Sequence, residues 1–265
     1  MNKWVKKSID LAKSKGYLDN LFSVYPIELG ASREVSNELK LSIRKALKNK
    51  NKKKLIIKLL KLPRFPIDDP YVSSLRKAQF LLDKNPKTVA RIGKRLISIG
   101  LENILKLASQ PKSPSRQFGH TFRNWLKTLG YPFLSEEKFL KDENKTVFLK
   151  GSDNALKKFA IKNLKIKKLD KGLDFVLKVK NKIILGEAKF LTSHGGTQDN
   201  QFNYAVRVAK IKRINIIGIT VLDGVVWFES GAHMHKTVKK IKGTALSSLL
   251  LKNFIKEIEK NLIEF

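Results

Sequence analysis

The spacing of apolar residues predicts that the first part of the chain is helical. In the run "VSNELKLSIRKALKNKNKKKLIIKLLKL", which starts at Val35, leucines and isoleucines recur every three or four residues, the spacing of one helix face. Pro63 and Pro66 end this run, because proline does not fit inside a helix. A later run with the same spacing starts at Pro86, and proline suits a first helical turn. We therefore expect residues 1–110 to form a helical region.

Prolines and serines separate this region from the rest of the chain. The stretch "SQPKSPSRQ", residues 109–117, has the composition of a loop, and we place a domain boundary there. Two further helices are predicted after it, in "SRQFGHTFRNWLKTLG" and "SDNALKKFAIKNL". From Leu173 onward the apolar period changes to two, which is typical of a strand.

The second part of the chain is expected to form a mixed sheet. The stretches "LDFVLKV" and "KIILGEAKF" predict two strands joined by a tight turn near Asn181. A helix is predicted in "TQDNQFNYAVRVAKIK", and "INIIGITVL" is uniformly apolar, like a strand inside a parallel or mixed sheet. We expect a short strand in "DGVVWF", after an Asp-Gly turn, and a closing amphipathic helix in "TALSSLLLKNFIKEIEKNL". The expected fold class is α/β (mixed α+β), with a helical region over 1–110 and a core over 111–265 in which helices flank a central mixed sheet.

Basic residues strongly outnumber acidic ones. The chain has 55 Lys and Arg against 23 Asp and Glu, a formal net charge of +32 and a pI near 10.2. Ion-pair networks that stabilise proteins at high temperature would raise glutamate together with lysine, and here the acids lag behind. A nucleic acid would relieve the resulting self-repulsion. Simple drift of the composition towards lysine and attraction to an anionic membrane surface are the alternatives.

Several classes of protein are excluded by the composition. The chain has no cysteine, which excludes disulfides, iron–sulfur clusters and thiolate zinc sites. No apolar run reaches the ~18 residues that span a bilayer. The basic N-terminus lacks the unbroken apolar stretch of a signal peptide. We therefore expect a cytoplasmic protein without membrane insertion.

Three charged residues mark the ends of the two central predicted strands. Asp174 lies on the first strand, and Glu187 and Lys189 end the second. Side chains alternate along a strand, so Glu187 and Lys189 share a face. Two neighbouring carboxylates fit Mg²⁺, which polarises a phosphodiester and lowers the pKa of a bound water, while the lysine can assist the attacking water. The Glu-x-Lys pattern also arises by chance in a lysine-rich chain, and a surface hairpin with incidental charges is the alternative.

These residues resemble a known nuclease signature. The stretches "LDFVLKV" and "IILGEAKF" are similar to the PD-(D/E)xK motif, with Leu173 in the usual place of the proline. Together with "SRQFGHTFRNWL" upstream, the stretch from Arg116 to Phe202 resembles type II restriction endonucleases. The resemblance implies a restriction-endonuclease-like core, Mg²⁺-dependent cleavage of double-stranded DNA at specific sites, a homodimer and a companion DNA methyltransferase.

Polar residues after the motif are candidates for contacts with DNA. Asparagine and glutamine can read adenine in the major groove, although Thr197 capping a helix with a polar first turn explains the same residues. The candidates for DNA binding are Gln198, Asn200, Gln201, Arg207, Arg116 and Arg123. Nucleases of this class often have another acid on a helix before the sheet, and Glu137 or its neighbour Glu136 is the candidate for it.

Two other functions fit the same sequence. One is a repair or recombination nuclease of the same fold, such as a junction resolvase. The other is a basic nucleic-acid-binding protein without catalysis, in which the acids are only structural. Mg²⁺-dependent cutting of plasmid DNA into discrete bands would distinguish a site-specific endonuclease from both.

Overall fold

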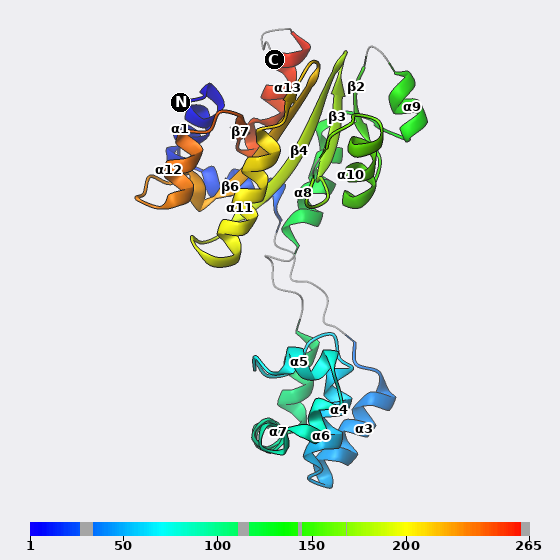
Figure 1. The fold of residues 1–265 in the computed structure, drawn as a ribbon. Helices are drawn as coiled ribbons and strands as arrows, with labels where there is room; N and C mark the ends of the chain where they lie inside the picture. Colours follow the sequence, from blue (N-terminus) through cyan, green and yellow to red (C-terminus); the bar gives the residue numbers. More distant parts are fainter. Residues whose placement is uncertain (27–33, 111–116, 143–144, 168, 261–265) are drawn as a thin grey trace. The chain divides into compact units, whose positions relative to one another are not determined.

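The protein consists of two compact units. The computed structural model describes residues 1–26, 34–110, 117–142, 145–167 and 169–260 (Figure 1). The first unit, here called the sheet unit, combines Met1–Ile27 with Pro114–Phe265. The second, the helical unit, is Glu28–Ser113. The helical unit is therefore an insertion into the sheet unit.

The sheet unit is built on a mixed sheet of seven strands. Its strand order is β1-β2-β3-β4-β6-β5, and β7 pairs with β6. β3 and β4 pair antiparallel as the predicted hairpin, whereas β4 and β6 are parallel, as the uniformly apolar sequence of β6 indicated. The strands are β1 (Phe133–Leu134), β2 (Thr146–Leu149), β3 (Phe175–Val179), β4 (Lys182–Leu191), β5 (Lys212–Arg213), β6 (Ile216–Gly224) and β7 (Thr244–Leu246).

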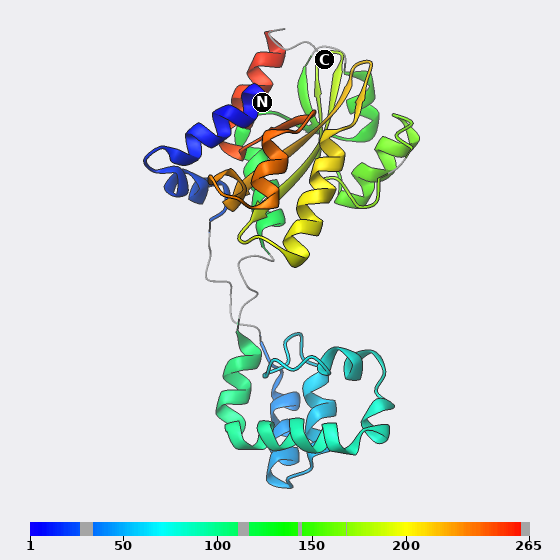
Figure 2. The same ribbon diagram turned by 60° about the vertical axis from the view of Figure 1, so that its left-hand side comes forward.

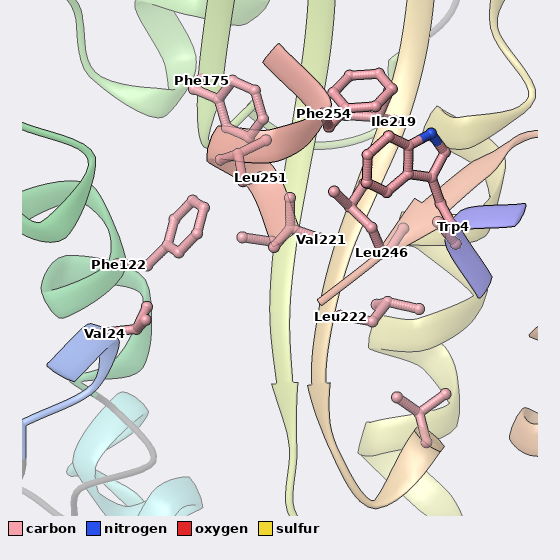
Figure 3. Packing of buried hydrophobic residues seen from close by; sticks show 14 of the residues in the cluster. Trp4, Val24, Phe122, Phe175, Ile219, Val221, Leu222, Leu246, Leu251 and Phe254 are labelled. Carbon is pink, nitrogen blue, oxygen red and sulfur yellow. The ribbon is translucent and has the colours of Figure 1, made fainter. Parts of the chain in front are cut away.

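Helices cover both faces of this sheet. One face packs on a large apolar cluster that includes Phe175 and Ile184 of the strands and the side chains of α1, α2, α8, α12 and α13 (Figure 3). The other face, with Val176 and Leu185, packs on α9, α10 and α11. The helices are α1 (Lys3–Lys13), α2 (Tyr17–Val24), α8 (Phe118–Leu126), α9 (Glu136–Lys141), α10 (Asp153–Lys162), α11 (Gly196–Ala209), α12 (His233–Lys239) and α13 (Leu251–Glu259), with 3-10 turns at Lys127–Leu129, Val225–Trp227 and Ser248–Leu250.

The helical unit has a core of its own. Figure 2 shows the helices of this unit, and its buried side chains, from Val35 to Ala108, form one cluster. At Gly93 of α7 an added Cβ would lie 2.4 Å from Cβ of Lys52, so the glycine allows α7 and α4 to approach closely. All elements among its described residues are helices: α3 (Asn37–Lys48), α4 (Lys52–Leu60), α5 (Val72–Lys77), α6 (Leu81–Lys84) and α7 (Pro86–Ser109), with a break in α7 at Gly100.

The first helices belong to a different core from the one expected. The elements before residue 110 are helical, as the pattern indicated, but the expected continuous region 1–110 is divided between the two units. Trp4, Val5 and Leu21 are buried in the same cluster as the strands of the sheet. Helical spacing shows that α1 and α2 have an apolar face, and it does not say which core that face joins.

Near the C-terminus, one predicted element is wrong and another begins later than predicted. Asp223 and Gly224 do not form a turn before a new strand, because β6 runs through them and Val225–Trp227 is a 3-10 turn. The closing helix begins at Leu251, later than expected, since Thr244–Leu246 pairs with β6 as β7. Among the described residues, no helix is both long and apolar enough to cross a membrane.

Candidate active site

The hairpin of β3 and β4 brings the two predicted acids together. Phe175 pairs with Gly186 in this antiparallel ladder, and the N–H of Asp174 donates to the carbonyl of Gly186 at 3.0 Å. Continuing the register by one residue places Asp174 opposite Glu187, so both side chains lie on one face of the sheet. Both residues are buried, with exposed fractions of 8% and 3%.

Lys189 joins the two carboxylates. Its Nζ lies 2.5 Å from Oε1 of Glu187 and 3.5 Å from Oδ2 of Asp174. That Oδ2 also accepts the backbone N–H of Ala188 at 2.9 Å. Burial alone would lower the pKa of Lys189, but the two carboxylates outweigh it and raise its pKa. Lys189 is therefore a fixed cation beside both acids.

Glu187 has one carboxylate oxygen without a protein partner. Its Oε2 is buried and accepts no hydrogen bond among the described residues. Burial, with the nearby charge of Asp174, raises the pKa of Glu187 to about 8, although Lys189 partly opposes this shift. A buried polar atom without a partner is costly, and a cation would satisfy it.

An arginine and a third acid lie next to this pair. Nη1 of Arg123, on α8, forms an ion pair with Oδ1 of Asp153 and lies 3.6 Å from Oδ1 of Asp174. Asp153 is the first residue of α10. Its carbonyl accepts the N–H of Leu173 at 3.2 Å, which ties the start of α10 to the chain just before Asp174.

The three acids and Lys189 line one cleft of ≈ 340 Å³ in the sheet unit. Aromatic rings form part of its wall: Tyr25 and Phe118 contact Phe190, with ring centroids 4.9 and 4.4 Å away, respectively. The residues lining the cleft also include Asp153, Gly172, Asp174, Glu187, Lys189 and Gln201.

The cleft residues fit a divalent ion that takes only part of its coordination from the protein. The described residues contain no group of three or more His, Asp or Glu side chains arranged as a complete metal site. Mg²⁺, however, is often held by one or two carboxylates, with waters and a phosphate completing its coordination. Oδ1 of Asp174 and the unpartnered Oε2 of Glu187 are the oxygens available for this.

The predicted DNA-reading residues lie in different environments. The side-chain amide of Gln198 bonds to Thr192, at 3.4 Å to its N–H and 3.3 Å to its Oγ1, and so closes the loop between β4 and α11. Asn200 is exposed, and Gln201 lines the cleft. α11 starts after Gly195 without a side-chain cap, so the alternative that Thr197 caps this helix is not found.

The three arginine candidates also lie in different places. Arg207 pairs with Asp170 at 3.1 Å, further along α11. Arg123 is held by Asp153 beside Asp174. Arg116 lies outside the described residues.

The accessory acid expected at Glu137 is not at the cleft. Glu137 is 76% exposed and pairs with Lys141, and Glu136 bonds to Asn163. Asp153 is the additional acid at the cleft, and the sequence analysis missed it. Its position in "GSDNAL", directly after a serine, looks like an ordinary first-turn acid of a helix. Only the contact of that helix end with the segment before β3 distinguishes it.

Comparison with known proteins identifies a family. The sequence matches the model of the Tsp45I type II restriction enzyme family over residues 2–258. No curated protein and no solved structure matches the chain.

Proposed function

Because the chain belongs to the Tsp45I type II restriction enzyme family, and is therefore a site-specific endonuclease acting on DNA, we propose that Asp174, Glu187 and Lys189 form its catalytic centre. The observation that carries this proposal is the buried cluster itself. Two carboxylates and an ammonium meet at the end of one strand pair, and one carboxylate oxygen has no partner among the residues that the structure describes. We further propose that the centre is of the PD-(D/E)xK type, with Leu173 in the place of the proline.

Type II restriction enzymes generally need divalent metal ions, and we propose Mg²⁺ here. Asp174 and Glu187 would hold it through Oδ1 and Oε2. When bound, the ion polarises the scissile phosphate and lowers the pKa of a coordinated water. Lys189, fixed between the acids, orients the attacking water and offsets negative charge that develops on the phosphate. Glu187 must be ionised to act, so its proton leaves before or during metal binding.

The helical unit is proposed to contribute to DNA binding. Its cations gather at the junction of α3 and α4, where the exposed lysines are Lys48, Lys50, Lys52, Lys53 and Lys54. Exposed lysines bind duplex DNA through its phosphates without reading sequence. We propose that bases are read at the start of α11, where Asn200 and Gln201 lie one short loop beyond β4, the strand of Glu187 and Lys189.

A homodimer and a companion methyltransferase complete the proposal. The described residues provide one catalytic cluster per chain, and cutting both strands of a symmetric site in one event takes two clusters. A DNA methyltransferase would protect the host genome from a site-specific endonuclease. Family membership favours this reading over a junction-resolvase-like enzyme and over a binding protein without catalysis.

Digestion of plasmid DNA tests the proposed function. The full-length protein is incubated with plasmid and Mg²⁺, and a parallel reaction contains EDTA. We expect discrete fragments with Mg²⁺ and intact plasmid with EDTA. A smear, or equal cutting in EDTA, would contradict the proposal.

A further inference from the structure

Arg123 lies beside the one oxygen of Asp174 that Ala188 and Lys189 do not engage. Oδ2 of Asp174 accepts hydrogen bonds from Ala188 and Lys189, so that oxygen is already engaged. Oδ1 faces the guanidinium of Arg123, 3.6 Å away. The oxygen available for a metal is therefore the one next to an arginine.

The arginine is held in this position by the fold. α8 is anchored by Phe122, a fully buried side chain whose ring lies 6.2 Å from that of Phe175. Asp153 pairs with Arg123 from the start of α10, and Gly172 allows that helix end to approach. A Cβ at Gly172 would lie only 2.5 Å from Cβ of Asp153. Two helices and the segment before β3 thus fix the guanidinium beside Asp174.

The same cleft contains a ligand oxygen that Arg123 does not satisfy. Oε2 of Glu187 is buried and without a partner among the described residues. The guanidinium thus lies at one of the two proposed ligand oxygens, Oδ1 of Asp174. The other, Oε2 of Glu187, has no partner among the described residues. A divalent ion that contacts both acids has to compete with the guanidinium at Oδ1.

We propose that Arg123 is an internal counter-ion of Asp174 that a divalent ion must displace, so that Arg123 weakens metal binding by the DNA-free protein. This inference rests on the proposed function, because it takes Asp174 and Glu187 as the metal ligands. Asp153 is a positioning residue that holds Arg123 beside Asp174. A DNA phosphate is an anion that can take over the displaced guanidinium, which would couple metal binding to substrate binding.

Metal binding without DNA tests this role. Mn²⁺ is titrated into the full-length protein, and free Mn²⁺ is measured by electron paramagnetic resonance. Removing one positive charge near the metal is worth roughly a tenfold change in affinity, so we expect Arg123→Gln to bind Mn²⁺ about ten times more tightly than the wild type. Arg123→Lys keeps the charge and should bind with an affinity closer to that of the wild type.

Matched variants separate this effect from general charge and from misfolding. Arg213→Gln removes the same charge from an exposed arginine of the sheet unit that bonds only to the carbonyls of Leu164 and Lys165 in the described contacts, and it should bind Mn²⁺ like the wild type. Circular dichroism during heating checks that each variant folds. Arg123→Ala is a second neutral replacement if Arg123→Gln does not fold.

Glu187→Gln distinguishes failure of this inference from failure of the proposed site. If Glu187→Gln binds Mn²⁺ as the wild type does, the proposed metal site itself is wrong. If Glu187→Gln loses binding but a folded neutral variant of Arg123 binds no more tightly than the wild type, only the counter-ion role is overturned. Equal tightening by Arg213→Gln would also overturn it, because the effect would then come from net charge.

Discussion

Asp223 is a fully buried acid that supports the wall of the catalytic cleft. Its carboxylate accepts hydrogen bonds from Tyr25 Oη at 2.9 Å and from Ser247 Oγ at 2.6 Å, and the N–H of Ser248 adds another. Burial raises the pKa of Asp223 to about 6, and these hydrogen bonds oppose part of the shift. Tyr25 in turn contacts Phe190, the residue after Lys189.

The raised pKa predicts how stability depends on pH. Between pH 4 and 6 Asp223 is protonated in the folded state and ionised in the unfolded state, so its contribution is complete below pH 4 and is lost as the pH rises through 6. Relative to Asp223→Asn, the wild type should lose roughly 2–3 kcal/mol of unfolding free energy across this window. Urea unfolding of both proteins at several pH values measures it. A constant difference between the two from pH 4 to 7 would refute the assignment.

The residues of the catalytic cluster differ in how far the sequence predicts them. Strand alternation and the short hairpin are local, so the sequence predicts that Glu187 and Lys189 share a face and that Asp174 lies near Glu187. The structure brings the three together. Asp153 and Arg123 come from two helices and meet beside Asp174. Their meeting depends on tertiary packing that no local pattern encodes, which is why Glu137 was chosen instead.

At the scale of elements, β4 and α11 connect the proposed catalytic residues to the proposed base-reading residues. β4 ends at Leu191, and α11 begins at Gly196 after a short loop that Gln198 closes on Thr192. Gly195 and Gly196 have positive φ angles of 92° and 56°, which glycine adopts without strain. The start of α11 is therefore held at a fixed position relative to Lys189.

Because α11 is fixed relative to Lys189, substitutions at its start and just after its end should have different effects on DNA binding. Asn200→Ala should cost about 1–3 kcal/mol of discrimination at one base position, the size of a lost bidentate contact. Lys210→Ala, just after the end of α11, should instead weaken binding equally on all sequences. Cleavage rates on the cognate site and on its single-base variants measure both. If Asn200→Ala leaves every ratio unchanged, recognition does not depend on this residue.

Gln198→Ala is expected to lower discrimination too. Because the side chain of Gln198 bonds to Thr192, this substitution also changes the position of the loop between β4 and α11.

Elements are predictable from sequence where a long run of residues has one consistent apolar pattern. β6 is uniformly apolar, and its parallel pairing with β4 agrees with that composition. The Asp-Gly pair at its end looked like a turn because such pairs usually lie at the surface. Here Asp223 is buried and bonded to Ser247, so the strand continues to Gly224. A buried partner far away in sequence overrode the local turn preference.

At the scale of the whole molecule, the sequence predicts two parts but not that one of them is inserted into the other. The apolar faces of α1 and α3 have similar spacing, yet α1 packs on the sheet and α3 in the core of the helical unit. The spacing of apolar residues predicts no linker at the start of the insertion. The prolines and serines near residue 110 do mark the point where the chain returns to the sheet unit.

The net charge predicts a steep salt dependence of DNA binding. Each phosphate contact adds about 0.9 to the slope of log K against log salt, and a protein at +32 should exceed a slope of about 3. Replacing Lys50, Lys52 and Lys54 with glutamine should lower the slope by about 1–3 if the α3–α4 junction meets the duplex. Fluorescence anisotropy with non-specific duplex at several salt concentrations measures the slope.

Three other lysines provide the control for this experiment. Lys3 and Lys7 pair with Glu257, and Lys13 pairs with Glu229, so these cations already have acidic partners. Their replacement by glutamine should leave the slope nearly unchanged. A wild-type slope below about 3 would instead favour compositional drift as the origin of the lysines.

The cleavage rate of the two carboxylate variants tests the central claim most directly. Asp174→Asn and Glu187→Gln keep the shape of the cluster but remove the charges that would hold Mg²⁺, and Glu229→Gln removes an acid that pairs with Lys13 instead. We predict that both cluster variants remain folded, still bind DNA, and cut plasmid at least about a thousandfold more slowly than the wild type in Mg²⁺, whereas Glu229→Gln cuts normally. Cutting within tenfold of the wild-type rate by either folded cluster variant would contradict the assignment of the catalytic centre.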